Sequence, residues 1–70
     1  MRRRPVSSSN LRSVGYDSES RILEVEFHQG GIYQYFGVPA HVYSSLMRAA
    51  SHGSYLHSHV KDIYPYARVS

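Results

Sequence analysis

Histidine is the residue type whose abundance most invites a chemical role, because five histidines occur among 70 residues. A zinc or nickel site needs ligands that converge on one ion, as a helical pair spaced i, i+4 does. His57 and His59 are two residues apart, about 200° around a helix axis, so their rings diverge. His52 and His57 would converge only through a favourable turn, with no carboxylate to assist them. We therefore expect no metal site and no other cofactor.

Serine and cysteine are the residue types that would supply a nucleophile. The chain has no cysteine, which excludes a thiol nucleophile, a disulfide and a thiolate metal site. Its serines fall in the N-terminal tail, in expected turns and at expected helix caps, without a positioned base. Gly30-Gly31 precedes an expected strand rather than a helix, unlike a phosphate-binding loop. A core this small leaves little room for a water-excluding pocket, so we expect no enzymatic activity.

Tyrosines and basic residues together form the pattern that best suits a binding function. Single-stranded nucleic acids are held by base stacking on aromatic rings and by positive charge along the phosphates. A basic arm can add phosphate contacts that position a nucleic acid without reading its sequence. The candidate nucleic-acid-binding residues are Tyr33, Tyr35, Tyr43, Tyr55, Arg48, Lys61, Arg68, Arg2, Arg3 and Arg4, with Tyr64 and Tyr66 as further aromatic candidates.

The net charge of +3 overstates how basic the folded part is. Three of the eight Lys and Arg residues form the run 2–4, and the remaining five are balanced by five acidic residues. Four of those acidic residues lie in the first half of the chain. The second half holds Arg48, Lys61, Arg68 and four of the five histidines, opposed only by Asp62. An anionic partner is therefore expected to meet the C-terminal half or the arginine tail.

The length of the chain predicts one domain of limited stability, because a core built from fewer than about 70–80 residues rarely supplies more than a few kcal/mol. No apolar run approaches the roughly 20 residues of a membrane span. Residues 1–5 are basic and lead into serines rather than into the apolar core of a signal peptide. These features predict a soluble, cytoplasmic protein without a membrane partner.

The first half of the chain predicts three strands. Residues 1–8 read as a disordered basic and serine-rich arm. A strand follows at residues 11–16, where Gly15 suggests a bulge that lets Leu11 and Val14 both turn inward. After a turn at residues 17–20, residues 22–27 form a second strand and residues 32–36 a third, joined by a loop at residues 28–31. The second strand alternates most clearly, with Leu23, Val25 and Phe27 on the core face.

The second half predicts two helices. Pro39 suits a first helical turn, and Gly53 suits a C-cap. Ser54 is then a plausible N-cap for the second helix, which Pro65 ends before residues 66–70 trail away. The expected buried positions are Val42, Leu46, Ala49 and Ala50 in the first helix and Leu56, Val60 and Ile63 in the second.

The resulting fold class is α+β: a three-stranded antiparallel β-meander followed by two C-terminal helices packed on one face. The domain spans residues 9–66, between the arm and a C-terminal tail at residues 67–70. Because a three-stranded sheet alone would be unstable, the helices must cover the face that carries Leu23, Val25 and Phe27.

The side occupied by Tyr33 and Tyr35 depends on the parity of the hairpin loop. With an odd number of loop residues, such as residues 29–31, Phe27 lies opposite Tyr33 and both tyrosines join the core face, while Gln34 faces solvent. With an even number, the tyrosines share the outer face with the glutamates and Gln34 is buried. Burying an unsatisfied amide costs about 1–3 kcal/mol, which favours the odd loop.

An ordered series of residues resembles a known family. The series is Val14-Gly15-Tyr16-Asp17, Leu23-x-Val25-x-Phe27, a glycine turn, Tyr33-x-Tyr35, Val38-Pro39, Val42-Tyr43, Leu46, Ala49-x-Ser51-x-Gly53-x-Tyr55 and Val60-Lys61-Asp62-x-Tyr64. From about Leu11 to Tyr66 it is similar to the KTSC domain, a module at the C-terminus of some lysyl-tRNA synthetases and a stand-alone bacterial protein. The series departs at Leu56-His57, where the family pattern has an aromatic residue and an asparagine.

The resemblance implies no catalytic residues, because the family has no established activity, and it suggests RNA binding through the synthetase context. We therefore expect a non-enzymatic RNA-binding module. The alternative is a protein-interaction or self-association module that uses the exposed edges of the sheet, as a monomer or a weak homodimer.

Overall fold

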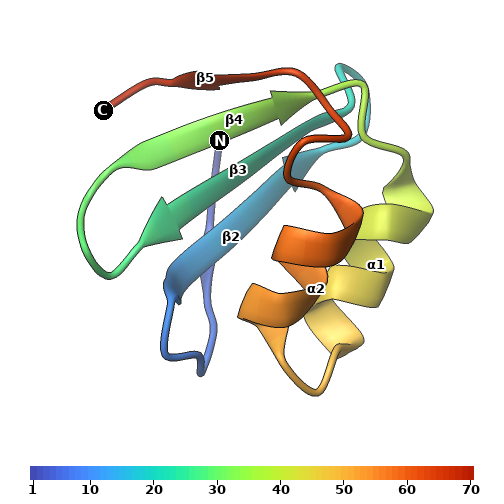
Figure 1. Cartoon of the computed structure of the whole chain (residues 1–70). Coiled ribbons are helices and arrows are strands. Elements are labelled where there is room, and N and C mark those ends of the chain that lie inside the picture. Colours follow the sequence, from blue (N-terminus) through green and yellow to red (C-terminus); the bar gives the residue numbers. More distant parts are fainter.

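A five-stranded antiparallel sheet carries both helices on one of its faces (Figure 1). The computed structural model describes all 70 residues. The elements are β1 (Arg4–Pro5), β2 (Leu11–Asp17), β3 (Ile22–Phe27), β4 (Ile32–Phe36), α1 (Ala40–Arg48), α2 (His52–His59) and β5 (Tyr66–Arg68). The α+β class is confirmed, as is the order of helices after the meander, but the expectation of a three-stranded sheet is wrong.

The two additional strands lie at the edges of the sheet. In place of a disordered segment, Arg4 and Pro5 pair with Val14 and Ser13 of β2. At the other edge, Tyr66 pairs with Tyr35, and Arg68 pairs with Tyr33. Strands of two and three residues are too short to show an alternating pattern, so their pairing depends on where the chain returns to the sheet.

The register of the β3–β4 hairpin confirms the odd loop parity. Glu26 pairs with Ile32, so the connection comprises residues 27–31, and Gly30 and Gly31 in it have φ angles of 105° and 94°. Tyr33 and Tyr35 therefore lie on the core face. Their partners are displaced by two residues from the expected ones, however, since Tyr33 lies opposite Val25 and not Phe27.

The bulge in β2 lies between Leu11 and Ser13 rather than at Gly15. As expected, Leu11 and Val14 are both fully buried. Gly15 has a different function in the fold: a Cβ atom at this position would lie 2.7 Å from the carbonyl oxygen of Arg2. The glycine therefore lets the N-terminal arm (residues 1–8) cross close to the sheet.

The helix boundaries differ from the expected ones. α1 already ends at Arg48, and Ser51 rather than Ser54 caps α2, because its Oγ atom accepts a hydrogen bond of 3.2 Å from the amide of Ser54. Gly53 lies inside α2, where a Cβ atom would be 3.0 Å from the side-chain amide nitrogen (Nδ2) of Asn10. Neither helix is long and apolar enough to cross a membrane.

The core lies between the sheet and the helices. Ile63, an expected core residue, is 58% exposed because α2 ends at His59 and the chain turns away after Val60. Ala50 is exposed because α1 has already ended. The ten buried apolar residues are Leu11, Val14, Leu23, Val25, Tyr35, Val38, Val42, Leu46, Leu56 and Val60.

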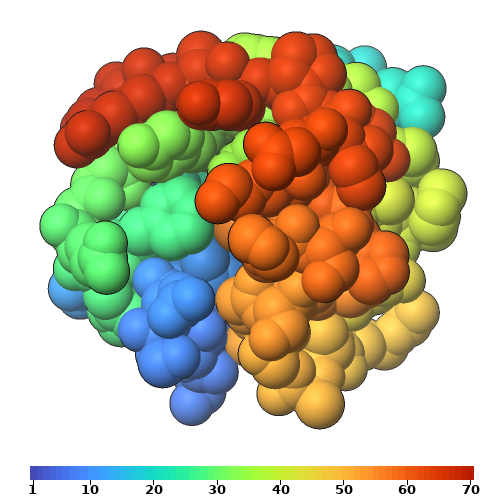
Figure 2. Space-filling view, in the orientation of Figure 1, coloured from blue at the N-terminus to red at the C-terminus, as the bar shows by residue number.

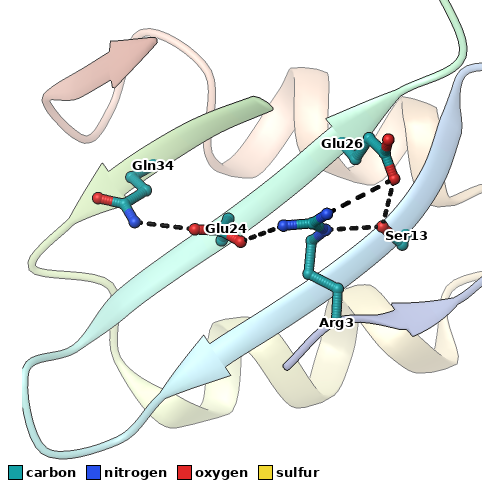
Figure 3. A network of polar contacts seen from close by, with 5 residues as sticks. All are labelled: Arg3, Ser13, Glu24, Glu26 and Gln34. Carbon is teal, nitrogen blue, oxygen red and sulfur yellow. Dashed lines mark hydrogen bonds and ion pairs between the residues drawn. The ribbon is translucent and has the colours of Figure 1, made fainter. Parts of the chain in front are cut away.

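The sheet face opposite the helices, called the outer face here, is covered by Arg3 from the N-terminal arm (Figure 3). The Arg3 guanidinium pairs with Glu24 and donates a 2.9 Å hydrogen bond to the hydroxyl of Ser13. That hydroxyl donates to Glu26 over 2.9 Å, and the Gln34 amide donates to Glu24 over 2.8 Å. The Gln34 amide is therefore part of a polar network, and Arg3 is not free to contact a partner.

The pKa of Glu24 links this network to stability. Burial alone raises this pKa, but hydrogen bonds from Gln34 and Arg3 and the charge of Arg3 outweigh burial and bring it below its ordinary value of 4.5. The unfolded state then binds more protons than the folded state in acid. The stabilisation is complete above pH 4.5 and is lost as the pH falls through the lower folded-state pKa.

We expect Glu24→Gln to flatten the acid limb of a plot of urea midpoint against pH. Asp17, whose pKa is lowered by hydrogen bonds from Ser20 and from the backbone, stays in both proteins, so the difference curve isolates Glu24. Parallel curves for wild type and variant below pH 4.5 would contradict this linkage.

Candidate nucleic-acid interface

A groove of about 400 Å³ opens between the core face of the sheet and α2. Its apolar lining comes from Leu11, Phe27, Tyr33, Tyr35, Leu56 and Tyr66, and its polar lining from Asn10, Gln29, Gly30, Gly53, His57, Lys61 and Asp62. Figure 2 shows this face, where the orange residues of α2 meet the green and teal residues of the sheet. The groove brings aromatic and cationic side chains together.

The aromatic wall of the groove is built by strand register. Phe27 and Tyr33 meet edge to face, with ring centroids 5.5 Å apart. β5 places the Tyr66 ring 5.9 Å from Tyr33 and 5.8 Å from Tyr35. Tyr66 is 60% exposed, so it offers a stacking surface that is already held by its neighbours.

Cationic side chains lie on two sides of this wall. The Arg68 guanidinium lies over the Tyr33 ring, 5.8 Å from its centroid. Lys61 lines the groove from the turn that follows α2. Its backbone amide donates a 2.9 Å hydrogen bond to the carbonyl oxygen of Leu56. Both ion pairs of the structure belong to Arg3, so Lys61 and Arg68 keep their charges available.

The phenol of Tyr35 stays protonated in the groove. Burial raises its pKa above 10.0, and the nearby Tyr33, Tyr66 and Asp62 groups raise it further. Tyr35 therefore remains a hydrogen-bond donor throughout the physiological range.

The structure separates the sequence-predicted residues into two groups. Tyr33, Tyr35 and Lys61 line the groove, and Arg68 flanks it through Tyr33. The remaining aromatic candidates lie elsewhere: Tyr43 stacks on Tyr16, Tyr55 stacks on His59, and Tyr64 packs against the core. Among the remaining cations, Arg48 is exposed at the end of α1 and Arg3 is bound on the outer face. Arg2 and Arg4 are exposed in the N-terminal arm. The groove therefore contains only part of the candidate set.

Several groove residues were missed by sequence reasoning. Phe27 was assigned to the core alone, and Asn10, His57 and Asp62 had no expected binding role. Tyr66 is one of the aromatic candidates of the sequence and lines the groove, but its place in a fifth strand was not expected. The strand that brings Tyr66 to the groove has only three residues, too few to show a periodic signal in the sequence.

The histidines mostly bond to main-chain oxygens. The Nε2 atom of His28 lies 2.9 Å from the carbonyl oxygen of Ser8, and the Nδ1 atom of His52 lies 2.8 Å from the carbonyl oxygen of Leu46. His59 contacts the carbonyl of Tyr55 at 3.3 Å. No three His, Asp or Glu side chains are grouped where they could hold one metal ion.

Fold and groove together define a small α+β domain with an aromatic groove. The model of the KTSC domain family matches residues 7–64. The chain therefore belongs to the KTSC domain family, and the resemblance seen in the sequence is confirmed.

The chain is similar to proteins of two kinds. An uncharacterised protein of Stutzerimonas stutzeri is 44% identical over 99% of both chains. A KTSC domain protein of Yersinia pestis, of known structure, is 38% identical with a TM-score of 0.96 and covers 99% of this chain and 97% of its own. A lysine–tRNA ligase of Trichormus variabilis is 36% identical over 89% of this chain, which spans 11% of that enzyme.

Proposed function

We propose that the protein is a non-catalytic RNA-binding module that acts in the cytoplasm and seats an unpaired nucleotide in the groove. One observation carries this proposal: the exposed ring of Tyr66 lies against Tyr33 and Tyr35 in a groove that Lys61 lines and that Arg68 flanks through its contact with Tyr33. Aromatic surface between positive charges is the combination that single-stranded nucleic acids require.

The dimensions of the groove fit this ligand. Its volume of about 400 Å³ lies within the usual range for small-molecule sites. A base can stack on Tyr66, and the flanking phosphates can approach Lys61 and Arg68. Because bases in a duplex are already stacked and paired, we expect the groove to prefer single strands, loops and ends.

Family context adds support. Relatives of this domain form 11% of each of three lysine–tRNA ligases, enzymes whose name gives tRNA as a substrate. This context favours RNA as the partner. The proposal does not extend to ligase activity, because the chain matches only that small part of each enzyme.

The proposal is tested by fluorescence anisotropy of labelled single-stranded RNA and of a fully paired hairpin, at about 50 and about 200 mM salt. We expect tighter binding of the single strand and weaker binding at the higher salt. Lys61→Ala should reduce the salt slope by about one unit. Arg48→Ala removes an equal charge outside the groove and serves as the matched control, so an equal effect of both variants would contradict the proposed site.

We expect Tyr66→Ala to weaken binding of single-stranded RNA about 5- to 150-fold, since base stacking on an aromatic ring contributes about 1–3 kcal/mol. Tyr66 is 60% exposed, so the variant should remain folded. Ile63→Ala, at a 58% exposed position that does not line the groove, is the control. Unchanged affinity of Tyr66→Ala, measured in the same anisotropy titration, would contradict stacking in the groove.

Self-association is the second candidate function, and the free edge of β5 favours it. β5 has a neighbour on one side only, and Tyr66 and Val69 on or beside it are 60% and 50% exposed. Edge strands of this kind can pair with a second copy. Sedimentation velocity over a range of protein concentrations without RNA tests this candidate, for which a concentration-dependent dimer is expected.

A further inference from the structure

Lys61 and Asp62 place opposite charges side by side at the groove. Both residues line it, both are exposed, and neither takes part in an ion pair. Their backbone is held in a defined turn: Ile63 and Tyr64 both donate amide hydrogen bonds to the carbonyl of Val60, and Asp62 has a φ angle of 66°. The groove therefore has a cationic and an anionic residue adjacent to each other on one well-defined turn of the backbone.

The carboxylate of Asp62 constrains which part of a nucleotide can occupy its side of the groove. A carboxylate repels phosphate, so phosphate groups are directed away from Asp62 and toward Arg68. The nearby Tyr35 phenol, whose proton the Asp62 charge helps to retain, adds a neutral donor within the groove. A ligand group that fits beside Asp62 must offer hydrogen-bond donors, which a base supplies as N–H groups.

The four bases differ in how well their hydrogen-bonding groups match the carboxylate of Asp62 and the ammonium group of Lys61. An aspartate accepts hydrogen bonds through two oxygens, and a lysine only donates. Guanine presents two adjacent donors, N1–H and N2–H, next to the O6 acceptor. Adenine and cytosine each offer a single donor group beside ring acceptors, and uracil offers one N–H between two carbonyl oxygens. Only guanine uses both carboxylate oxygens and the ammonium group together.

We propose that the groove selects guanine, with Asp62 accepting from N1–H and N2–H, Lys61 donating to O6, and the base stacked on Tyr66. The assignment rests on the proposed function, RNA binding in this groove, and adds the identity of the base. Matched bidentate hydrogen bonding to a base edge gives about 5- to 150-fold discrimination against a wrong base.

Five short single-stranded RNAs test the assignment, identical except for a central guanine, hypoxanthine, adenine, cytosine or uracil. Hypoxanthine keeps O6 and N1–H of guanine but lacks the N2 amino group. Anisotropy competition should give the tightest binding for guanine, intermediate binding for hypoxanthine, and weaker binding for the other three. Amide chemical shifts should change at the groove residues in the guanine titration.

Asp62→Asn is the decisive variant. Asparagine tolerates the positive φ angle of this position, so the turn should be preserved. The amide presents one oxygen and one NH₂ group, and so clashes with one guanine donor. The preference for guanine over hypoxanthine should disappear, while binding of the adenine RNA should stay within about twofold or improve through loss of a negative charge. Glu19→Gln, an exposed carboxylate in the β2–β3 turn, is the matched control.

The outcomes separate the two proposals. Equal, salt-sensitive binding of all five RNAs would overturn guanine selection and leave RNA binding in place. Selection of guanine that survives Asp62→Asn would also overturn the assignment to this residue. Binding of none of the RNAs at low salt would overturn the proposed function and guanine selection with it.

Discussion

Leu46→Ala is expected to leave the protein largely unfolded at room temperature. Leu46 is fully buried and faces the sheet from α1. Replacing a buried leucine by alanine costs about 2–5 kcal/mol, through lost apolar burial and the cavity that remains. A domain of this size rarely has more than about 3–5 kcal/mol in total. Urea unfolding followed by far-UV circular dichroism should show a lost or strongly shifted transition.

The location of Leu46 in a helix identifies lost packing as the origin of the destabilisation by Leu46→Ala. Alanine is the best helix former, so the loss cannot come from helix propensity. Ser44→Ala, at an exposed position of the same helix, is the matched control and should be neutral or slightly stabilising. A loss below about 1 kcal/mol for Leu46→Ala would show that the core relaxes around the change, contrary to close packing of the helices on the sheet.

Arg3→Ala is expected to destabilise the fold by about 1.5–3 kcal/mol, the range for a hydrogen bond to a charged group. Glu24 is 6% exposed and would lose its counter-charge, although the Gln34 amide would remain. Because a quarter of the Arg3 side chain reaches solvent, the lower end of this range is expected. Guanidinium chloride or urea melts of the variant and the wild type measure the difference.

Two further variants identify the cause. Arg4→Ala removes the neighbouring exposed charge and should change stability by less than about 0.5 kcal/mol. Glu24→Gln in the Arg3→Ala background removes the unpaired carboxylate, so the double variant should lose less than the sum of the single changes. Equal losses for Arg3→Ala and Arg4→Ala would show that the N-terminal arm contributes only through its backbone pairing.

Arg3 also changes the interpretation of the basic arm. In the sequence, residues 2–4 form one cationic run available to phosphates. In the structure, the middle arginine neutralises the acidic outer face (Figure 3), and Arg4 pairs with Val14 at the edge of the sheet. An RNA bound in the groove should therefore gain little from the arm.

The central hairpin was predictable in detail because its information is local. Alternation in β3 assigns Leu23 and Val25 to the core, and the cost of burying Gln34 assigns Tyr33 and Tyr35 to the same face. The bounds of β3 and β4 agree with the expected ranges. The exact partners were off by two residues, because parity constrains which face a residue occupies but not the length of the loop.

The helix ends were harder to predict. Ser51 and Ser54 are both reasonable N-caps, and Gly53 resembles a C-cap by its type. The choice depends on where α1 must stop so that Leu56 and Val60 can reach the sheet, which local propensity does not encode. Ile63 became exposed for the same reason, since the chain leaves the helix before reaching it.

The sequence by itself determined the α+β class, the core face of the sheet and the family, because alternation, helical spacing and an ordered motif series are properties of neighbouring residues. Only the tertiary structure decided which residues form a site. β5 brings Tyr66 and Arg68 to Tyr33, the turn after α2 brings Lys61 and Asp62 to the same groove, and the arm commits Arg3 to Glu24. These contacts join segments far apart in the chain, and strands of two or three residues carry no periodic signal of their own.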